Sequence, residues 1–375
     1  MDSQDLEATT LENFQELKKK TSEILKEMVK GKTETSSEKD SAPIEKLNNA
    51  LPAKSIYQHS YSSLSHNEKN DSDEVSTNGE NSHPDGSETS VGTLNQVSEV
   101  DLNPIPILPP SARRVEENTV KGVRNYPKGA KLGNAMHRIF ELTDFEKIGR
   151  LESAEAAAND TAFNKLIQEE FKSEGFAIHK HADWEKQSAY FVWNTLNAQL
   201  PEIQGNRYLE KNFSLREIPA TNRKAEMEFQ MNADGLEKNL QNYCKGFIDL
   251  LFKRGEYYSI LDWKSDVLEN YGVGNEEISG TQEKVDSDYA VQRVLYSYCL
   301  IQWLKSFYNE SEEEIFERHF GGVYYVFFRG CQKDTSFGIY AQTWENFAAL
   351  KKAFEQVKEL MYRKLKNAKN GEEEN

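Results

Sequence analysis

Two carboxylates and one amine occur in this chain at a spacing that could bring them to one point. Asp249 lies in the apolar run 246–252, and Asp262 and Lys264 follow thirteen and fifteen residues later in the run 257–265. Both runs have the apolar pattern of β-strands. A carboxylate inside a strand is costly unless it is paired or binds a cation. Because alternate residues of a strand share a face, we expect Asp262 and Lys264 on the same side.

A second strand that adds Asp249 to that side would complete a group of two acids and an ammonium. Acids of this kind hold Mg²⁺, and a neighbouring cation can position or polarise an attacking water. Metal-dependent phosphodiester hydrolysis needs this combination. Taken alone, however, D-x-K favours a structural Asp–Lys pair between strands, so other parts of the chain must decide.

The overall composition predicts that part of the chain is disordered. The chain has 375 residues, a formal net charge of −16 and 37% apolar residues, which is low for a wholly folded chain. The acidic balance also makes unaided DNA capture unfavourable, because phosphate affinity comes mainly from Lys and Arg. Acid clusters recur in the part expected to fold, for example at 312–314.

Cysteine content and hydropathy bear on the compartment. The three cysteines, Cys244, Cys299 and Cys331, are scattered as in proteins of a reducing cytosol. They are also too few for the four thiolates of an iron–sulfur cluster. No run approaches the length of a membrane span, and the acidic N-terminus does not match a secretory signal. We therefore expect a cytoplasmic protein that does not use a membrane.

Composition and periodicity divide the chain into successive segments. They are a short amphipathic helix in 1–30, a disordered low-complexity linker at 31–103, an extended lead-in at 104–125, a folded domain at 126–366 and a polar tail at 367–375. The first of these could be a docking element or a solvated, marginal helix, and the sequence leaves both open.

Periodicity within the folded domain predicts an α/β (α+β) architecture. Helices are expected at about 132–145, 160–172, 183–199, 286–307 and 344–366, and strands at about 224–231, 244–253, 256–264 and 321–329. This order implies a mixed central sheet flanked by helices. No G-x-x-x-x-G-K-[ST] occurs, so we expect no ATP site of the P-loop type in this chain.

Other polar residues stand at regular spacing around the D-x-K region. His137 follows Gly133 in G-x-x-x-H, on a stretch with a helical pattern. Glu226 and Glu228 alternate with apolar residues, as on a solvent-facing acidic strand. Gln292 is followed four residues later by Tyr296, which places both on one face of a helix. Singly, each of these has an ordinary explanation as a packing or surface residue.

Together, these stretches resemble one family. The motifs G-x-x-x-H, E-M-E-F, K-G-F-I-D-L, L-D-x-K-S, Q-x-x-x-Y and F-G-G-V-x-Y-x-F-x-R-G occur in this order. They resemble the C-terminal nuclease domain of the RecB subunit of exodeoxyribonuclease V, in the PD-(D/E)xK nuclease superfamily. The resemblance covers about 125–345 and implies a restriction-endonuclease-like core.

The resemblance implies roles for individual residues. The implied metal ligands are His137, Asp249, Asp262 and the backbone carbonyl of Trp263. The implied catalytic residues are Asp249, Asp262, Lys264 and Glu226, with Gln292 and Tyr296 supporting the site beside the bound strand. The family often has Tyr where this chain has Trp263, and since the backbone is the ligand, we expect little effect.

The implied function is that of a Mg²⁺-dependent DNA nuclease of the exodeoxyribonuclease V type, acting in double-strand-break repair and recombination. An oxygen- and nitrogen-lined site also suits Mn²⁺, whereas Ca²⁺ is expected to occupy it and inhibit turnover. The helicase portion that precedes the nuclease in the family is replaced here by the low-complexity N-terminus. The expected partners are therefore DNA, a separate helicase and RecC/RecD-like subunits.

Two other functions remain open. One is a non-catalytic scaffold subunit that keeps the fold, although every matched acid and the lysine are present. The other is a stand-alone nuclease like the Cas4 and AddB relatives, which usually carry the iron–sulfur cluster that three cysteines cannot build.

Overall fold

The computed structural model describes residues 57–60, 102, 104–107, 126–232, 242–272 and 280–372. All of them belong to one compact unit, made of Tyr57–Lys238 and Asn242–Asn375. The helix expected in 1–30, nearly all of the expected linker 31–103 and most of the lead-in lie outside the described residues. No described helix is both long and apolar enough to cross a membrane.

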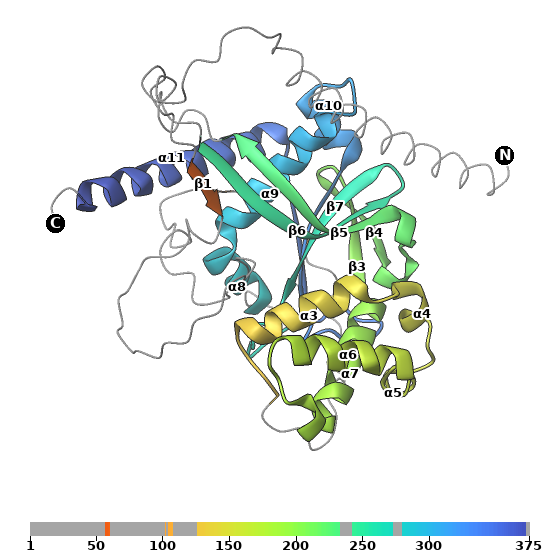
Figure 1. Cartoon of the computed structure of the whole chain (residues 1–375). Helices are drawn as coiled ribbons and strands as arrows, with labels where there is room; N and C mark the ends of the chain where they lie inside the picture. Colours follow the sequence, from red (N-terminus) through yellow and green to blue (C-terminus); the bar gives the residue numbers. More distant parts are fainter. Residues whose placement is uncertain are drawn as a thin grey trace, which may run out of the picture. The chain divides into compact units, whose positions relative to one another are not determined.

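A seven-stranded mixed sheet forms the centre of this unit (Figure 1). The strands lie in the order β1-β6-β7-β8-β9-β2, and β5 pairs with β6 outside this path. Their bounds are Tyr57–Ser60 (β1), Pro104–Ile107 (β2), Arg223–Asn232 (β5), Asn242–Arg254 (β6), Tyr257–Lys264 (β7), Phe320–Phe327 (β8) and Ile339–Trp344 (β9). The pairs β1–β6 and β7–β8 are parallel and the others antiparallel. A separate hairpin joins β3 (Leu200–Gln204) to β4 (Arg207–Phe213).

Helices cover both faces of the sheet, as Figure 1 shows. The first group consists of α3 (Ala130–Leu142), α4 (Phe145–Gly149), α5 (Ala154–Ala158), α6 (Thr161–Ser173) and α7 (Ala182–Asn197). The second consists of α8 (Gly280–Asp288), α9 (Ala290–Lys305), α10 (Glu312–His319) and α11 (Phe347–Glu372). Short 3₁₀ turns occur at Ile178–Lys180, Leu215–Glu217 and Ala220–Asn222.

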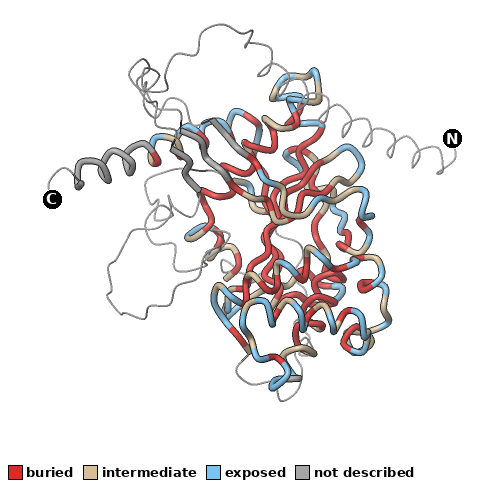
Figure 2. The backbone as a smooth tube through the Cα atoms, in the orientation of Figure 1, coloured by how far each residue is buried: buried red, intermediate tan, exposed pale blue. Residues whose placement is uncertain are grey.

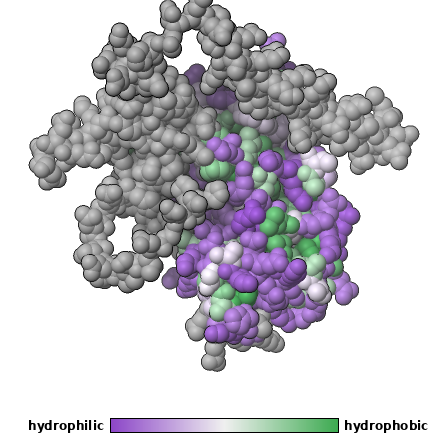
Figure 3. Space-filling view, in the orientation of Figure 1, coloured by the Kyte–Doolittle hydropathy of each residue, from purple (hydrophilic) through white to green (hydrophobic). Residues whose placement is uncertain are grey.

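Each helix group encloses a hydrophobic core against the sheet, and the buried backbone follows the sheet and the helices beside it (Figure 2). The first core lies under α3–α7 and the second under α8–α11. The exposed faces of α3–α7 are mostly hydrophilic, with small hydrophobic groups between them (Figure 3). The two-sided burial explains why β7 and β8 read as almost continuous apolar runs rather than as alternating ones.

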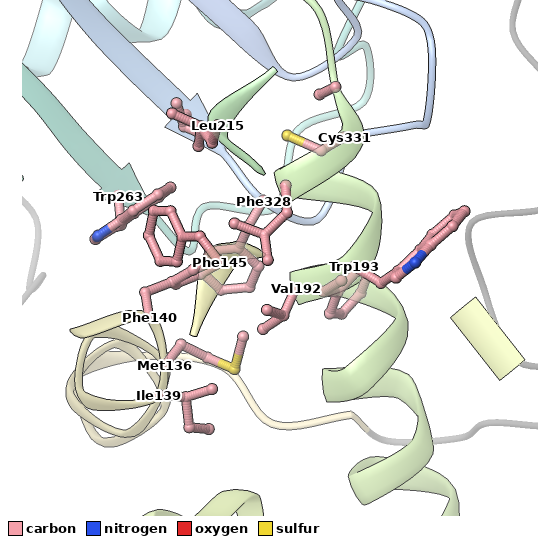
Figure 4. Close-up of a cluster of buried hydrophobic side chains, with 14 of the residues drawn as sticks. Met136, Ile139, Phe140, Phe145, Val192, Trp193, Leu215, Trp263, Phe328 and Cys331 are labelled. Atoms are coloured by element: carbon pink, nitrogen blue, oxygen red, sulfur yellow. The ribbon is translucent and has the colours of Figure 1, made fainter. Parts of the chain in front are cut away.

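Helix α3 shows how sequence pattern determines packing beside the future site. Met136, Ile139 and Phe140 recur at helical spacing and are fully buried. All three lie in the first core (Figure 4), where the Phe140 ring stacks on that of Trp263 of β7 with 4.1 Å between ring centroids. Burying each such side chain contributes about 1.5 to 3 kcal/mol, so this stripe fixes the rotation of α3 about its axis. His137, next to Met136 on α3, is thereby directed toward Asp249 of β6 and the Trp263 carbonyl of β7.

The extended segment expected after the linker takes part in the sheet. Pro104–Ile107 forms β2, which pairs with β9 in antiparallel register. Ile107 reaches the first core, and Leu102 reaches the second while its carbonyl accepts a hydrogen bond from Trp344 Nε1 at 3.2 Å. Strand β2 therefore forms one edge of the sheet, beside a strand more than 200 residues later in the chain.

The predicted fold class is confirmed, since a mixed sheet is flanked by helices. Several elements differ from the sequence-based expectation. The helix expected at 286–307 is two helices, α8 and α9, because Tyr289 between them adopts φ −120° and ψ 10°. The helix expected at 344–366 begins at Phe347 and continues to Glu372, into the expected polar tail. Strand β9 and the β3–β4 hairpin were not expected from periodicity.

Candidate active site

The chemistry-bearing residues gather where β6 separates from β7. The two strands pair from Leu250 to Arg254 on β6, whereas residues 242–245 of β6 pair with β1 instead. Asp249 is the first residue beyond the β6–β7 ladder. Its Oδ2 accepts a hydrogen bond from the Trp263 backbone N–H at 2.8 Å. The carboxylate thus accepts the hydrogen bond of the Trp263 N–H of β7 at the point where the two strands separate. We call this point of separation the fork.

Glu226 of β5 lies at an abrupt change of strand geometry. Ala225 packs on the first core, whereas Met227, two residues later, packs on the second, although regular alternation would place both on one face. The change coincides with Glu226, whose φ of 47° is in the left-handed region that glutamate rarely adopts. Register on both sides of Glu226 places it opposite Asp249 of β6.

Three side chains from three elements converge in the fork. Each of His137, Glu226 and Asp249 offers a ligand atom, and these atoms lie within 4.8 Å of one another. His137 Nδ1 is 3.6 Å from Asp249 Oδ2, and its Nε2 is 3.1 Å from the Trp263 carbonyl oxygen. We call His137, Glu226 and Asp249 the His–Glu–Asp cluster.

The charge of the His–Glu–Asp cluster favours a bound cation. Two carboxylates this close repel each other, and the repulsion is strong where water is scarce. The Asp249 side chain is only 11% exposed. Like charges directly opposite on paired strands destabilise a sheet unless something neutralises them.

The donor atoms also fit a hard divalent ion. Carboxylate, carbonyl and imidazole atoms suit Mg²⁺ or Mn²⁺. Neighbouring ligands of an octahedral ion bound at about 2.1 Å are about 3 Å apart. The 3.6 Å between His137 Nδ1 and Asp249 Oδ2 is near that value, so these two atoms suit one ion. In this sense the residues present fit the metal that the sequence implies.

Trp263 connects the site to the first core. Its indole is buried against Phe140 of α3, with the ring planes 9° apart. Its peptide N–H and C=O point instead to Asp249 and His137. The side chain is therefore a packing group, while the backbone contributes the polar atoms to the site.

A second group forms around Asp262 and Lys264, the two sequence neighbours of Trp263. Asp262 and Lys264 are 3% and 5% exposed, and Lys264 Nζ lies 2.6 Å from Asp262 Oδ2. Gln292 of α9 donates from Nε2 to Asp262 Oδ1 at 2.8 Å. The ring of Tyr289 lies against the Lys264 ammonium, with 3.7 Å between Nζ and the ring centroid. We call Asp262, Lys264, Gln292 and Tyr289 the lysine cluster.

The expected site residues thus divide between two clusters. His137, Glu226, Asp249 and the Trp263 carbonyl lie together, whereas Asp262 is directed toward Lys264 and Gln292 and does not belong to the His–Glu–Asp cluster. The shared face of Asp262 and Lys264, expected from strand alternation, is present. Glu228 is exposed, and the Tyr296 ring packs edge-on against Phe229 at 5.1 Å, as a core residue does.

Sequence reasoning missed Tyr289. Tyr289 precedes Gln292 by three residues, so helical spacing alone could have placed it on the same face. Its contact with Lys264 depends on the break before α9, for which no Gly or Pro in 286–292 gives a signal.

Comparison with known proteins identifies the family. The PD-(D/E)XK nuclease superfamily matches residues 113–374. The chain belongs to this superfamily. This membership agrees with acids on two neighbouring strands and a D-x-K sequence at the end of β7.

Individual relatives include RecB proteins of the RecBCD enzyme. The chain is 27% identical over 249 residues to the RecBCD enzyme subunit RecB of Escherichia coli (strain K12), covering 59% of this chain and 18% of that subunit. RecB of Buchnera aphidicola subsp. Schizaphis graminum is 25% identical over 249 residues, covering 60% and 19%. An ATP-dependent helicase/nuclease subunit of Clostridium botulinum (strain Alaska E43 / Type E3) is 24% identical over 192 residues, covering 49% and 14%. The resemblance to RecB is confirmed, and the chain spans less than a fifth of the length of these relatives.

Proposed function

We propose that this protein is a Mg²⁺-dependent DNA nuclease of the exodeoxyribonuclease V type, acting in double-strand-break repair and recombination. The observation that carries the proposal is the presence of two polar clusters around neighbouring residues of β7. Two carboxylates and a histidine lie at the Trp263 backbone, and a buried lysine held by an acid flanks Trp263 in the sequence. The concentrated negative charge suits a metal ion, and the fixed ammonium beside it suits a phosphate.

In this proposal His137, Asp249 and the Trp263 carbonyl hold the ion, with Glu226 as an additional acid. When bound, Mg²⁺ polarises the scissile phosphate and lowers the pKa of a coordinated water. The N–H of Trp263 keeps the Asp249 carboxylate oriented, as hydrogen bonds to metal ligands commonly do. Mn²⁺ should substitute for Mg²⁺, and Ca²⁺ should inhibit.

Asp262 is proposed to supply a further ligand oxygen from the lysine side. Its buried Oδ2 lies in the ion pair with Lys264 but accepts no hydrogen bond of normal geometry from the described residues. Gln292 meanwhile holds the other oxygen. Lys264 stabilises the negative charge that develops on the phosphate or orients the attacking water.

The wider assembly is proposed from the relatives. Their names assign them to a RecBCD enzyme and to an ATP-dependent helicase/nuclease. We propose that this nuclease receives DNA in the cytoplasm from a separate helicase, with RecC/RecD-like subunits. The net charge of −16 supports a feeder, because such a chain attracts DNA weakly by itself.

The test is a digestion assay with the full chain. Linear duplex, circular plasmid and single-stranded DNA are incubated with Mg²⁺, Mn²⁺ or Ca²⁺, with and without a helicase partner and ATP. We expect cleavage with Mg²⁺ and Mn²⁺ and none with Ca²⁺, and we expect Asp249→Asn to abolish it. An absence of cleavage under every condition would favour the scaffold function, and full activity of Asp249→Asn would remove the site assignment.

A separate binding assay tests whether the nuclease needs a helicase to deliver its DNA. Binding of the isolated chain to DNA is measured at increasing salt. Weak binding at physiological salt is expected. Tight binding with a steep salt dependence would argue for a nuclease that works alone.

A further inference from the structure

The lysine cluster contains an aromatic residue that none of the family motifs includes. The Lys264 ammonium lies 3.7 Å from the centroid of the Tyr289 ring and 5.7 Å from that of Tyr325. The Lys264 side chain is 7% exposed, so this contact is made almost without water. Cation–π contacts are strongest when the cation is shielded from water in this way.

The Tyr289 ring is held from several directions. It occupies the N-cap position of α9, and its hydroxyl donates to Asp266 Oδ2 at 3.0 Å. Asp266 is paired in turn with Lys284 of α8, at 3.2 Å. On the sheet side Tyr325 of β8 stacks on Tyr289 with 5.7 Å between ring centroids and 19° between planes. A ring fixed in this way offers the Lys264 ammonium a contact surface that does not move.

An aromatic ring face is a suitable neighbour for a lysine whose ammonium contacts a phosphate. Asp262 attracts the ammonium toward its carboxylate, and without the Tyr289 ring the flexible four-carbon stem could follow that carboxylate into other rotamers. The ring face attracts the charge without imposing the direction of a hydrogen bond. The ammonium therefore keeps a fixed position while its N–H groups can adjust to a substrate oxygen.

We propose that Tyr289 is a positioning residue for Lys264 in the nuclease reaction. Its ring face holds the ammonium beside Asp262, where it meets the scissile phosphate. This inference rests on the proposed function of the site. It attributes the effect to the ring and not to the hydroxyl, which faces Asp266.

The first experiment compares Tyr289→Phe with Tyr289→Leu in the full chain. Tyr289→Phe keeps the ring, and its kcat is expected within about threefold of wild type. Tyr289→Leu removes the ring, and kcat is expected to fall by about 10- to 30-fold, with KM for DNA within about twofold. Tyr340→Leu is the matched control, because Tyr340 is a buried tyrosine of the same core on β9, two strands away from Lys264. It should lose comparable thermal stability and keep kcat. Equal losses of kcat in Tyr289→Leu and Tyr340→Leu would overturn the inference.

The second experiment changes the electronics of the ring and not its size. Phenylalanines with increasing fluorination are incorporated at position 289, which weakens the negative potential of the ring face. A stepwise fall in kcat with fluorination is expected. A kcat that does not change across the series would overturn the inference.

The third experiment does not depend on cleavage. Lysine labelled with ¹³C at Cε gives a signal for Lys264 that is assigned by its loss in Lys264→Arg. An upfield ring-current shift is expected in wild type and Tyr289→Phe and should disappear in Tyr289→Leu. A cleaving wild type with unaltered kcat in Tyr289→Leu would refute the positioning role alone. A wild type that cleaves nothing but shows the shift would refute the proposed function, and the Tyr289 contact would then be structural.

Discussion

The His–Glu–Asp cluster and the lysine cluster differ in exposure and in charge. The His137 and Asp249 side chains are 26% and 11% exposed, and they lie with Glu226 in a group rich in negative charge. The Lys264 and Asp262 side chains are 7% and 4% exposed and neutralise each other. The first cluster has an excess of negative charge, whereas in the second the charges of Asp262 and Lys264 balance. Removing charge should therefore have opposite effects on stability in the two clusters.

The largest effect is expected from Asp249→Asn. It removes the charge of a proposed metal ligand in the His–Glu–Asp cluster, so cleavage should fall by at least about 100-fold. The wild type should also gain about 2.7 kcal/mol of stability at a Mg²⁺ concentration 100 times its Kd, and Asp249→Asn should gain little. Cleavage rates and unfolding with and without Mg²⁺ measure both. Glu228→Gln is the matched control, since Glu228 is an exposed acid of the neighbouring strand.

The lysine cluster is tested by Lys264→Met. The substitution leaves the buried Asp262 carboxylate without its cation, which should cost about 3 to 5 kcal/mol in the free energy of unfolding. Asp262→Asn combined with Lys264→Met should recover most of this loss, because no charge remains buried. Urea denaturation of the two variants and wild type measures it. Equal stability of Lys264→Met and wild type would show that the pair is not coupled as the geometry indicates.

The opposite sign is expected for Glu226→Gln. The substitution removes the repulsion between opposing carboxylates, and without metal the protein should become more stable by about 0.2 to 1 kcal/mol. Its gain on adding Mg²⁺ should be smaller than that of the wild type. Denaturation in EDTA and in Mg²⁺ separates the two effects. A loss of stability in EDTA would mean that Glu226 is held by attractive contacts and that the comparison of the clusters is wrong.

The smallest effect is expected from Trp263→Tyr, between the clusters. The backbone atoms that face Asp249 and His137 are unchanged, so cleavage should remain within about threefold of wild type. The smaller ring should cost about 1 to 2 kcal/mol of stability through weaker packing on Phe140. A loss of cleavage larger than the loss of stability explains would show that the indole itself serves the site.

Strand alternation was sufficient to predict one part of the site. It placed Asp262 and Lys264 on one side of β7, where the structure has their ion pair. The apolar runs of the sequence also located β6 and β7. The roles of His137 and Glu226 came only from the family resemblance, since a single histidine or acid has no distinctive pattern.

The remaining features depend on long-range contacts. The reversal of faces at Glu226 carries no glycine or proline, so local propensity could not indicate it. The break at Tyr289 follows from the fit of its ring against Lys264 and Tyr325, which lie on other elements. These are the positions where tertiary contacts override the local pattern, and both lie beside the candidate site.

The prolines of β2 have a consequence for assembly. Pro104 and Pro106 have no N–H, so the donors that pair with β9 must come from Ile105 and Ile107. The outward side of β2 then presents carbonyl acceptors but lacks amide donors at both prolines. Another polypeptide could not pair with this edge strand through a complete ladder of hydrogen bonds. This disfavours edge-to-edge association between copies of the protein. A partner that binds the nuclease by strand addition would therefore have to pair with a different edge of a sheet.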